Sequence, residues 1–170
     1  MPLITPAVEA DLPRLLEIRH AAFAAQAPSA YTDEQVRTLL DDVDPDELLA
    51  MIADRQLFVA RLDPDAGADG EVVGSAGWQR TRLRHVYVDP AHTRRGIATA
   101  LLTYVESDFR RRTGAVEIHA GVALHAEGFY LATGYRVVSR ETDWDGSEYL
   151  AMIKAFGPET TPAGRPEQSG

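Results

Sequence analysis

The segment 83–106 (LRHVYVDPAHTRRGIATALLTYVE) contains residue types whose order suits the binding of an anion. A short alternating strand is followed by an Asp-Pro stop, a polar loop and a long helix with apolar periodicity. The first N–H groups of a helix have no intrahelical acceptor, and the helix dipole adds about half a positive charge there. Gly96 and Ala98 leave these groups uncovered, while Arg94 and Arg95 add positive charge. The segment therefore predicts a diphosphate-binding loop at 93–99.

This loop differs from the common nucleotide-binding motifs. The chain has no G-x-x-x-x-G-K-[ST] sequence, and no G-x-G-x-x-G opens the helix. Residues 80–112 contain 8 basic and 3 acidic residues, although the net charge of the chain is −9 at pH 7. A local anion site and a solvated arginine surface both fit this distribution. The overall acidity argues against a nucleic-acid partner, which needs a broad basic surface.

Composition restricts the remaining chemistry. A length of 170 residues, 45% of them hydrophobic, suits one globular domain with a single core. The lack of cysteine excludes disulfides, thiolate metal sites and cysteine nucleophiles. The histidines form no H-E-x-x-H or comparable pair, so we expect no metal. The N-terminus lacks a signal peptide, and no stretch approaches the roughly 20 apolar residues that span a bilayer, so we expect a cytoplasmic protein without a membrane partner.

The spacing of apolar residues along the chain predicts the strands and helices that must position the loop. Strands are predicted at 3–5, 56–62, 71–79, 82–88, 115–122, 135–139 and 149–156. Helices are predicted at 11–25, from Thr32, from Asp44, at 97–112 and at 125–133. Thr32 and Gln35 have capping-box spacing, and Pro45 follows Asp44 as a first helical residue. Helices, three strands, a helix, a strand, a helix and a closing hairpin predict an α+β fold.

Two motifs resemble those of the GNAT superfamily of acetyl-CoA-dependent N-acetyltransferases. The segment YVDPAHTRRGIATALL resembles the family's pyrophosphate motif [QR]-x-x-G-x-[GA], whose defined positions are filled by Thr93, Gly96 and Ala98. About thirty residues later, HAEGFYLATGY resembles the signature F-Y-x-x-x-G-[FY] through Phe129, Tyr130, Gly134 and Tyr135. Two positions depart from the family pattern: Thr93 replaces the usual Gln or Arg, and His125 replaces an Asn that many members have.

The resemblance implies a single GNAT-like domain over residues 1–156, and the composition of 157–170 predicts a disordered tail. The domain would have a mixed, mostly antiparallel sheet of about 6–7 strands flanked by about 4–5 helices. A V-shaped splay would separate the strands at 84–88 and 115–122, and the exposed backbone of Val86 and Val88 would pair with the amides of pantetheine. The residues that the resemblance assigns to acetyl-CoA are Val86, Tyr87, Val88, Thr93, Arg94, Arg95, Gly96, Ile97, Ala98, Thr99 and His125.

The reaction of this family is the attack of a neutral amine on a thioester, which needs a base for the amine and a proton for the departing thiolate. The resemblance implies that Tyr130 is the general acid, because a phenol of pKa near ~10 stays protonated at neutral pH. Packing beside Phe129 is the alternative role. His85 is the candidate base, in place of the fourth-strand Glu or water chain of other members. His119 competes for this role, and a structural role is open for both histidines.

The acceptor side is predicted from exposed aromatic and acidic residues. Acids there would attract a cationic amine, and a Trp would cover it. The candidates are Tyr31, Asp143, Trp144, Asp145 and Glu148. We expect acetyl transfer to a primary amine of a small molecule or peptide, by a monomer or homodimer. A non-catalytic acyl-CoA-binding or sensing module and a transferase for a bulkier acyl-CoA are the alternatives, and the presence of Tyr130 favours an enzyme.

Overall fold

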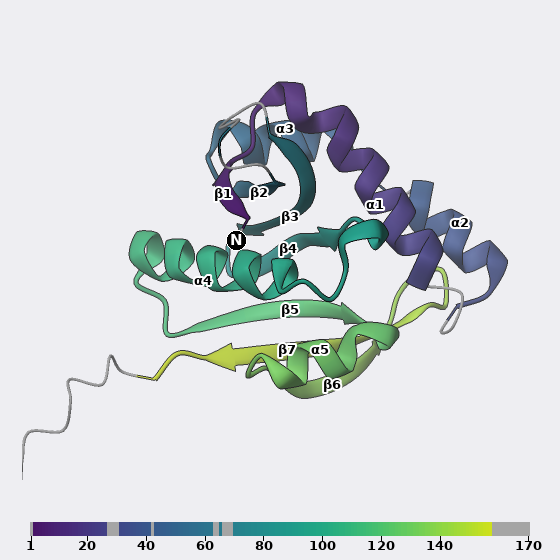
Figure 1. The fold of residues 1–170 in the computed structure, drawn as a ribbon. Coiled ribbons are helices and arrows are strands. Elements are labelled where there is room, and N and C mark those ends of the chain that lie inside the picture. The colour runs from purple at the N-terminus through teal and green to yellow at the C-terminus, as the bar shows by residue number, and fades with distance from the viewer. Residues whose placement is uncertain (1, 27–30, 42, 63–64, 66–69, 158–170) are drawn as a thin grey trace, which may run out of the picture.

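The computed structural model describes residues 2–26, 31–41, 43–62, 65 and 70–157, which form one sheet with helices on both faces (Figure 1). The seven strands have the order β1-β2-β3-β4-β5-β7-β6. Their bounds are Leu3–Pro6 (β1), Leu57–Leu62 (β2), Glu71–Gln79 (β3), Arg82–Val88 (β4), Glu117–Ala123 (β5), Arg136–Thr142 (β6) and Glu148–Ala155 (β7). Neighbouring strands are antiparallel except β4 and β5, which are parallel. The predicted α+β fold with a mostly antiparallel sheet is confirmed.

Five α-helices occur in the described part of the chain: Leu12–Gln26 (α1), Asp33–Asp41 (α2), Pro45–Ala53 (α3), Ile97–Thr113 (α4) and Glu127–Ala132 (α5). Side chains fix the starts of α2 and α3. The predicted capping box is present, because Thr32 N–H donates to Gln35 Oε1 at 3.1 Å and Gln35 N–H donates to Thr32 Oγ1 at 3.2 Å. Asp44 Oδ1 accepts from Asp46 N–H at 2.9 Å, and Pro45 begins α3 as predicted.

Two apolar clusters lie on opposite faces of the sheet. Along β2, Phe58 and Ala60 belong to one cluster and Leu57 and Val59 to the other, as the two-residue period of a strand requires. The larger cluster packs α4 and α5 against the sheet, and the smaller one packs α1 and α3. The apolar stripe predicted on α4 is buried in the larger cluster; it consists of Ile97, Leu101, Leu102, Val105 and Phe109.

The parallel strands β4 and β5 separate after a short paired stretch. Their register contains only Arg82 opposite His119 and Leu83 opposite Ala120, so the predicted splay is confirmed. On its other side β4 pairs with β3, but that register shifts opposite His85, which has a left-handed φ of +54°. An irregularity of this kind bends a strand and increases its twist. The bend in β4 therefore accompanies the opening beside β5.

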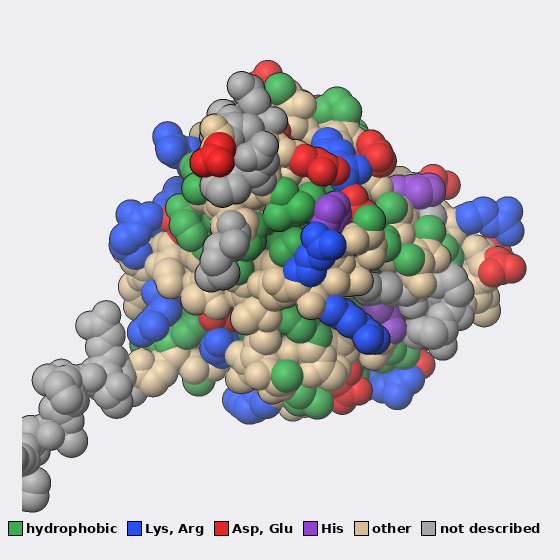
Figure 2. Space-filling model, viewed as in Figure 1, with side chains coloured by type: hydrophobic (Ala, Val, Ile, Leu, Met, Phe, Trp, Pro, Cys, Tyr) green, Lys and Arg blue, Asp and Glu red, His purple; other side chains and the backbone are tan. Residues whose placement is uncertain are grey.

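The predicted element boundaries agree with the structure to within a few residues. β5 begins at Glu117 rather than 115, and the predicted helix 125–133 is a 3₁₀ turn over Leu124–Ala126 followed by the shorter α5. Residues 63–70, between the predicted strands 56–62 and 71–79, lie mostly outside the described residues, as does the predicted tail from residue 158 on. No helix in the described part of the chain is long and apolar enough to cross a membrane. On the face shown in Figure 2, basic and acidic side chains are interspersed among hydrophobic ones.

Phe109 tests the contribution of the larger cluster to stability. Its side chain is fully buried, with 0% exposure, and its ring contacts Trp78 at a centroid distance of 5.4 Å. Phe109→Ala should lower the free energy of unfolding by about 3–5 kcal/mol, because it removes buried contacts and leaves a cavity. Urea denaturation measures this loss. The control Ser107→Ala, at an exposed position of the same helix, should change stability by less than about 0.5 kcal/mol. Similar losses in both variants would contradict the position of this core.

Candidate active site

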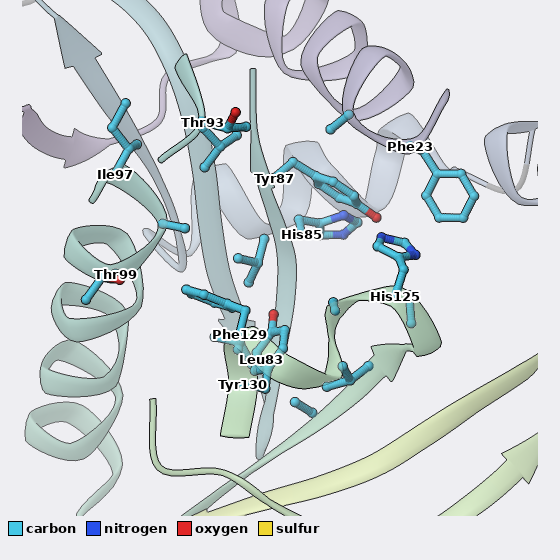
Figure 3. Close-up of a pocket in the computed structure, with 18 of the residues that line it drawn as sticks. Phe23, Leu83, His85, Tyr87, Thr93, Ile97, Thr99, His125, Phe129 and Tyr130 are labelled. Carbon is cyan, nitrogen blue, oxygen red and sulfur yellow. The ribbon is translucent and has the colours of Figure 1, made fainter. Parts of the chain in front are cut away.

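A cavity of about 490 Å³ opens between the diverging strands β4 and β5, in front of the start of α4. Residues of α1, β4, the β4–α4 loop, α4, β5 and α5 line it. Figure 3 shows Thr93 and Thr99 at one end of the cavity and Phe23 and His125 at the other, with His85 between them. The cavity therefore connects the predicted anion-binding loop with an aromatic region beside α1.

The backbone of β4 offers polar groups to this cavity. Asp89 N–H donates to a β3 carbonyl at 2.8 Å, and Tyr87 lies opposite Ser75 of β3. Hydrogen-bonding directions alternate along a strand, so the N–H and C=O groups of Val86 and Val88 face β5. The β4–β5 register ends before these residues. Because unpaired backbone groups need a partner, an extended ligand with amide groups would match this edge.

The β4–α4 loop leaves the first amides of α4 open. Thr93 Oγ–H donates to Pro90 O at 3.2 Å, which closes the turn before the helix. Gly96 has a left-handed φ of +76° and caps the helix, and a Cβ added to it would have no atom within 4 Å. Ala100 N–H is bonded to Gly96 O at 3.0 Å, so the N–H groups of 97–99 precede the helical hydrogen bonds. Open amides at the positive end of a long helix form a phosphate-binding geometry.

The residues assigned to acetyl-CoA from the sequence lie on the cavity wall, except for Arg95. The side chain of Arg95 is exposed, and its Nη1 atom lies 3.4 Å from Nδ1 of His92, which does line the cavity. Arg94 lines the wall and has a left-handed φ of +62°. The positive charge predicted for the loop therefore reaches the cavity through Arg94, while Arg95 faces outward.

Tyr130 lies on α5 and reaches the cavity from within the larger apolar cluster. Its ring makes edge contacts with Phe129 and Tyr135, at centroid distances of 5.2 and 5.3 Å. Burial raises the pKa of the Tyr130 hydroxyl, and the nearby Tyr87 and Glu106 raise it further. The phenol is therefore protonated at neutral pH.

Tyr135, whose ring contacts Tyr130, belongs to a polar cluster with Glu106 and Lys154. The Tyr135 hydroxyl donates to Glu106 Oε1 at 3.0 Å, and Lys154 Nζ lies 2.9 Å from Glu106 Oε2. Burial raises the pKa of Tyr135, and the Glu106 carboxylate raises it further. The cluster ties α4 to β7 and pairs the buried Glu106 charge with a cation.

His85 stands at the bend of β4. Ser75 Oγ–H donates to its carbonyl at 2.8 Å, and its side chain is only 11% exposed. Burial lowers the pKa of the imidazole to about 4, and the charges of Arg84 and Arg19 lower it further. An ordinary histidine has a pKa of about 6.5, so His85 is a weaker base than the histidine type alone predicts. His85 is neutral at pH 7 and can accept a proton only as a weak base.

The competing histidine, His119, lies outside this cavity. Its side chain is 40% exposed and its Nε2 atom lies 3.4 Å from Glu117 Oε1, on the same strand. Of the two histidines weighed as bases, His85 alone borders the space where a ligand would react.

Aromatic side chains surround the end of the cavity opposite the loop. The rings of Phe23, Tyr31 and His125 lie 6.1 to 6.4 Å apart between centroids. The Tyr31 hydroxyl donates to Glu148 O at 3.0 Å and accepts from Leu124 N–H at 3.4 Å. These bonds join the residues before α2 to the start of β7 and to the residue that follows β5. Burial lowers the pKa of His125, whose Nδ1 atom is buried without a hydrogen-bond partner among the described residues.

The model of the acetyltransferase (GNAT) domain matches residues 27–156. The chain belongs to the GNAT acetyltransferase family. No curated protein sequence matches it.

Solved GNAT structures have the same fold. A GCN5-related N-acetyltransferase from Rhodopseudomonas palustris is 22% identical with a TM-score of 0.81, and the match covers 92% of this chain and 96% of that one. The PaiA N-acetyltransferase of Thermoplasma acidophilum, in complex with coenzyme A, is 21% identical with a TM-score of 0.68, covering 92% and 99%. An aminoglycoside 6'-N-acetyltransferase complexed with coenzyme A is 17% identical with a TM-score of 0.59, covering 92% and 98%.

The sequence analysis missed part of the wall of this GNAT cavity. Ala22 and Phe23 of α1 line it, as do Phe129 and the β5 residues 120–123. Phe23 has the helical spacing of an apolar face, but the same spacing describes a core residue and a cavity residue. A splay between β4 and β5 was expected, but the alternation along β5 does not indicate which of its residues border the opening.

The acidic residues expected at the acceptor side of the GNAT domain do not line the cavity. Asp145 accepts from Ser147 N–H at 2.9 Å within the β6–β7 turn, and Glu148 Oε2 lies 2.7 Å from Arg140 Nη2. Trp144 is 78% exposed on the same turn. The sequence shows the charges of these acids but not the partners that they have in the folded chain. Of the five candidates, only Tyr31 contacts the aromatic end of the cavity.

One group of potential metal ligands lies near the loop. Glu71, Asp89 and His92 have ligand atoms within 4.8 Å of one another. Arg14 Nη2 lies 2.6 Å from Asp89 Oδ2 and 3.6 Å from Glu71 Oε1, so an arginine already compensates the negative charge. A backbone bond from Ala91 and this arginine lower the pKa of Asp89. The group serves as an ion pair that ties α1 to the start of the loop.

The low pKa of His85 should make stability depend on pH. Between about pH 6.5 and 4 the unfolded chain protonates this imidazole and the folded chain does not, so stability is lost as the pH falls through this window. Between pH 7 and pH 4.5 the parent should lose on the order of 2 kcal/mol more than His85→Asn. Urea denaturation at both pH values measures this, with His20→Asn on the surface of α1 as control. Identical pH dependence of the parent and His85→Asn would contradict the depressed pKa.

Proposed function

We propose that this protein is an N-acetyltransferase that moves the acetyl group of acetyl-CoA to a primary amine, with Tyr130 as general acid. The observation behind the proposal is the shared cavity. It combines the open helix start at Gly96, the unpaired backbone of β4 and the buried phenol of Tyr130. A long ligand with a diphosphate, amide groups and a thioester has chemical groups suited to each of these three parts.

Acetyl-CoA would be held along this cavity by groups of matching chemistry. The diphosphate would lie on the amides of 97–99, with Arg94 adding positive charge. The pantetheine amides would pair with the backbone of Val86 and Val88, and His125 would supply a ring N–H. PaiA N-acetyltransferase and the aminoglycoside 6'-N-acetyltransferase, which have this fold, are both found in complex with coenzyme A. These complexes support coenzyme A as the ligand of this cavity.

The reaction moves two protons and one acyl group. The amine nitrogen forms a bond to the thioester carbon, and the carbonyl electron pair moves onto oxygen. When the C=O bond re-forms, the C–S bond breaks and its electron pair leaves on sulfur. Tyr130 gives its proton to this sulfur, and His85 takes the proton released by nitrogen. Solvent then returns a proton to the phenolate and removes one from the imidazolium, so the products are the amide and CoA-SH.

The weak basicity of His85 is compatible with this step. Attack gives the nitrogen a positive charge while it is bonded to an electron-poor carbon, which makes its proton more acidic than that of a free ammonium. A neutral imidazole beside the reacting atoms is then sufficient as an acceptor. Because its pKa is depressed to about 4, His85 stays available as a base throughout the neutral range.

The helix start is tested by placing a negative charge on it. Gly96→Glu should weaken the binding of CoA by about 100-fold or more, because a carboxylate would occupy the space in front of the open amides. Isothermal titration calorimetry measures the affinity. Gly114→Glu is a matched control: Gly114 caps the other end of α4 with a φ of +69°, and an added Cβ also meets open space there. Equal CoA affinity of the Gly96→Glu and Gly114→Glu variants would remove the diphosphate from this loop.

The role of Tyr130 is tested by removing its proton and keeping its ring. Tyr130→Phe should lower kcat by about 100-fold or more, while CoA affinity stays near that of the parent. Release of CoA thiol in the presence of an active amine measures kcat. Tyr104→Phe, which changes an exposed tyrosine on α4, is the control. An unchanged kcat in Tyr130→Phe would leave this residue a packing role.

A further inference from the structure

Glu47, which lies on α3 and outside the cavity wall, has an unexplained position beside His85. Its Oε2 atom lies 3.8 Å from Nε2 of His85. We infer that Glu47 is a positioning residue that holds the proton of neutral His85 on Nε2 and thereby leaves Nδ1 as the nitrogen that accepts a proton in the cavity. The inference rests on the proposed function for its role in catalysis, but the tautomer itself is a property of the protein alone.

The Glu47 carboxylate is held in place from two sides. It lies in the first turn of α3, a helix whose start is fixed by the Asp44 cap and by Pro45. Its Oε1 atom forms an ion pair with Arg84 Nη2 at 2.6 Å, and its side chain is three-quarters buried. With one oxygen bound to Arg84, the other is directed at His85. The carboxylate therefore has little freedom to turn away from the imidazole.

The two ring nitrogens of His85 have different surroundings. Nε2 has no access to solvent and no hydrogen-bond partner among the described residues. Since His85 lines the cavity, Nδ1 is the nitrogen that can be open to it. An ionised carboxylate accepts hydrogen bonds and cannot donate them, so it attracts an N–H and repels a lone pair. The tautomer with hydrogen on Nε2 is therefore favoured beside Glu47.

Charged groups from three elements face this imidazole. Glu47 of α3 is the negative one, and Arg84 of β4 and Arg19 of α1 are the positive ones. A fourth neighbour, Ser75 of β3, bonds to the carbonyl of His85 rather than to its ring. The arginines disfavour protonation of the ring as a whole, whereas Glu47 acts on one nitrogen. The carboxylate thus selects the tautomer without making the resting imidazole a cation.

Catalysis would use this arrangement at the moment of proton transfer. When Nδ1 takes the proton from the amine, the ring becomes an imidazolium with N–H groups on both sides. The Nε2–H group then faces an ionised carboxylate, and the separation of 3.8 Å is longer than a hydrogen bond, so the contact would shorten as the ring becomes charged. Glu47 thereby stabilises the charged ring that the reaction forms.

The tautomer is measured by nitrogen-15 NMR of the protein with labelled histidine and no ligand at pH 7. Parent enzyme should show the His85 resonances of an Nε2–H ring with an unprotonated Nδ1. Glu47→Gln should give a mixture of tautomers, because a carboxamide can donate as well as accept. Asp46→Asn should retain the parent tautomer, since it changes an exposed carboxylate of the same helical turn and leaves Glu47 and Arg84 in place. An Nδ1–H ring in the parent, or the same tautomer in the parent and in Glu47→Gln, would overturn the inference.

Kinetics separate positioning from simple structural support. With an active amine, Glu47→Gln should lower kcat by about 10-fold and leave the KM for acetyl-CoA within about 2-fold, and Glu47→Asp should recover part of the loss. Asp46→Asn neutralises an exposed carboxylate in the same helical turn and should have the kcat of the parent. Equal kcat for Glu47→Gln and the parent would overturn the catalytic part. Failure of the parent to acetylate any amine would instead count against the proposed function, because the NMR result does not depend on turnover.

Discussion

The separation of β4 from β5 is the constraint on which the site depends. A sheet normally satisfies its backbone through neighbouring strands, but here the parallel pairing ends at Leu83 and Ala120. The backbone beyond Leu83 keeps one bonded side, toward β3, and offers the other to the cavity. The start of α4 reaches the same opening because the helix packs directly on β3. A Cβ added at Gly74 would lie 3.0 Å from both Leu101 Cδ1 and Tyr87 O, so a side chain here would require these neighbours to shift.

The two faces of the sheet supply different parts of the proposed chemistry. Tyr130 comes from the larger apolar cluster, where burial keeps its hydroxyl protonated. His85 comes from the bend of β4 and meets Glu47 on the side of α3. The left-handed φ of +54° at His85 is unfavourable for a non-glycine residue, and the bond from Ser75 stabilises the carbonyl in this conformation. A strand bend thus opens the sheet and also places an imidazole at the opening.

The sequence predicts those parts of the site whose signals are local. The strand, Asp-Pro stop, Gly96 and apolar helix are contiguous, so the loop could be located before its geometry was known. The contact between Glu47 and His85 could not, because it joins distant segments and an alternating strand gives no sign of a bend. Phe23 has the helical spacing of a core residue, which does not distinguish it from a residue that lines a cavity. The local partners of the acids in the β6–β7 turn, such as Arg140 for Glu148, could not be predicted because they follow from the hairpin register and not from charge counts.

The central claim is that one continuous surface, from the start of α4 along the unpaired backbone of β4, binds coenzyme A. Amide hydrogen exchange followed by NMR, with and without coenzyme A, tests it most directly. We expect the amides of Val86, Val88 and residues 97–99 to become protected together, because ligand bonds would replace exchange with water. Amides of β6, on the far edge of the sheet, should exchange as before. Protection confined to other segments, with β4 and the start of α4 unchanged, would contradict the claim.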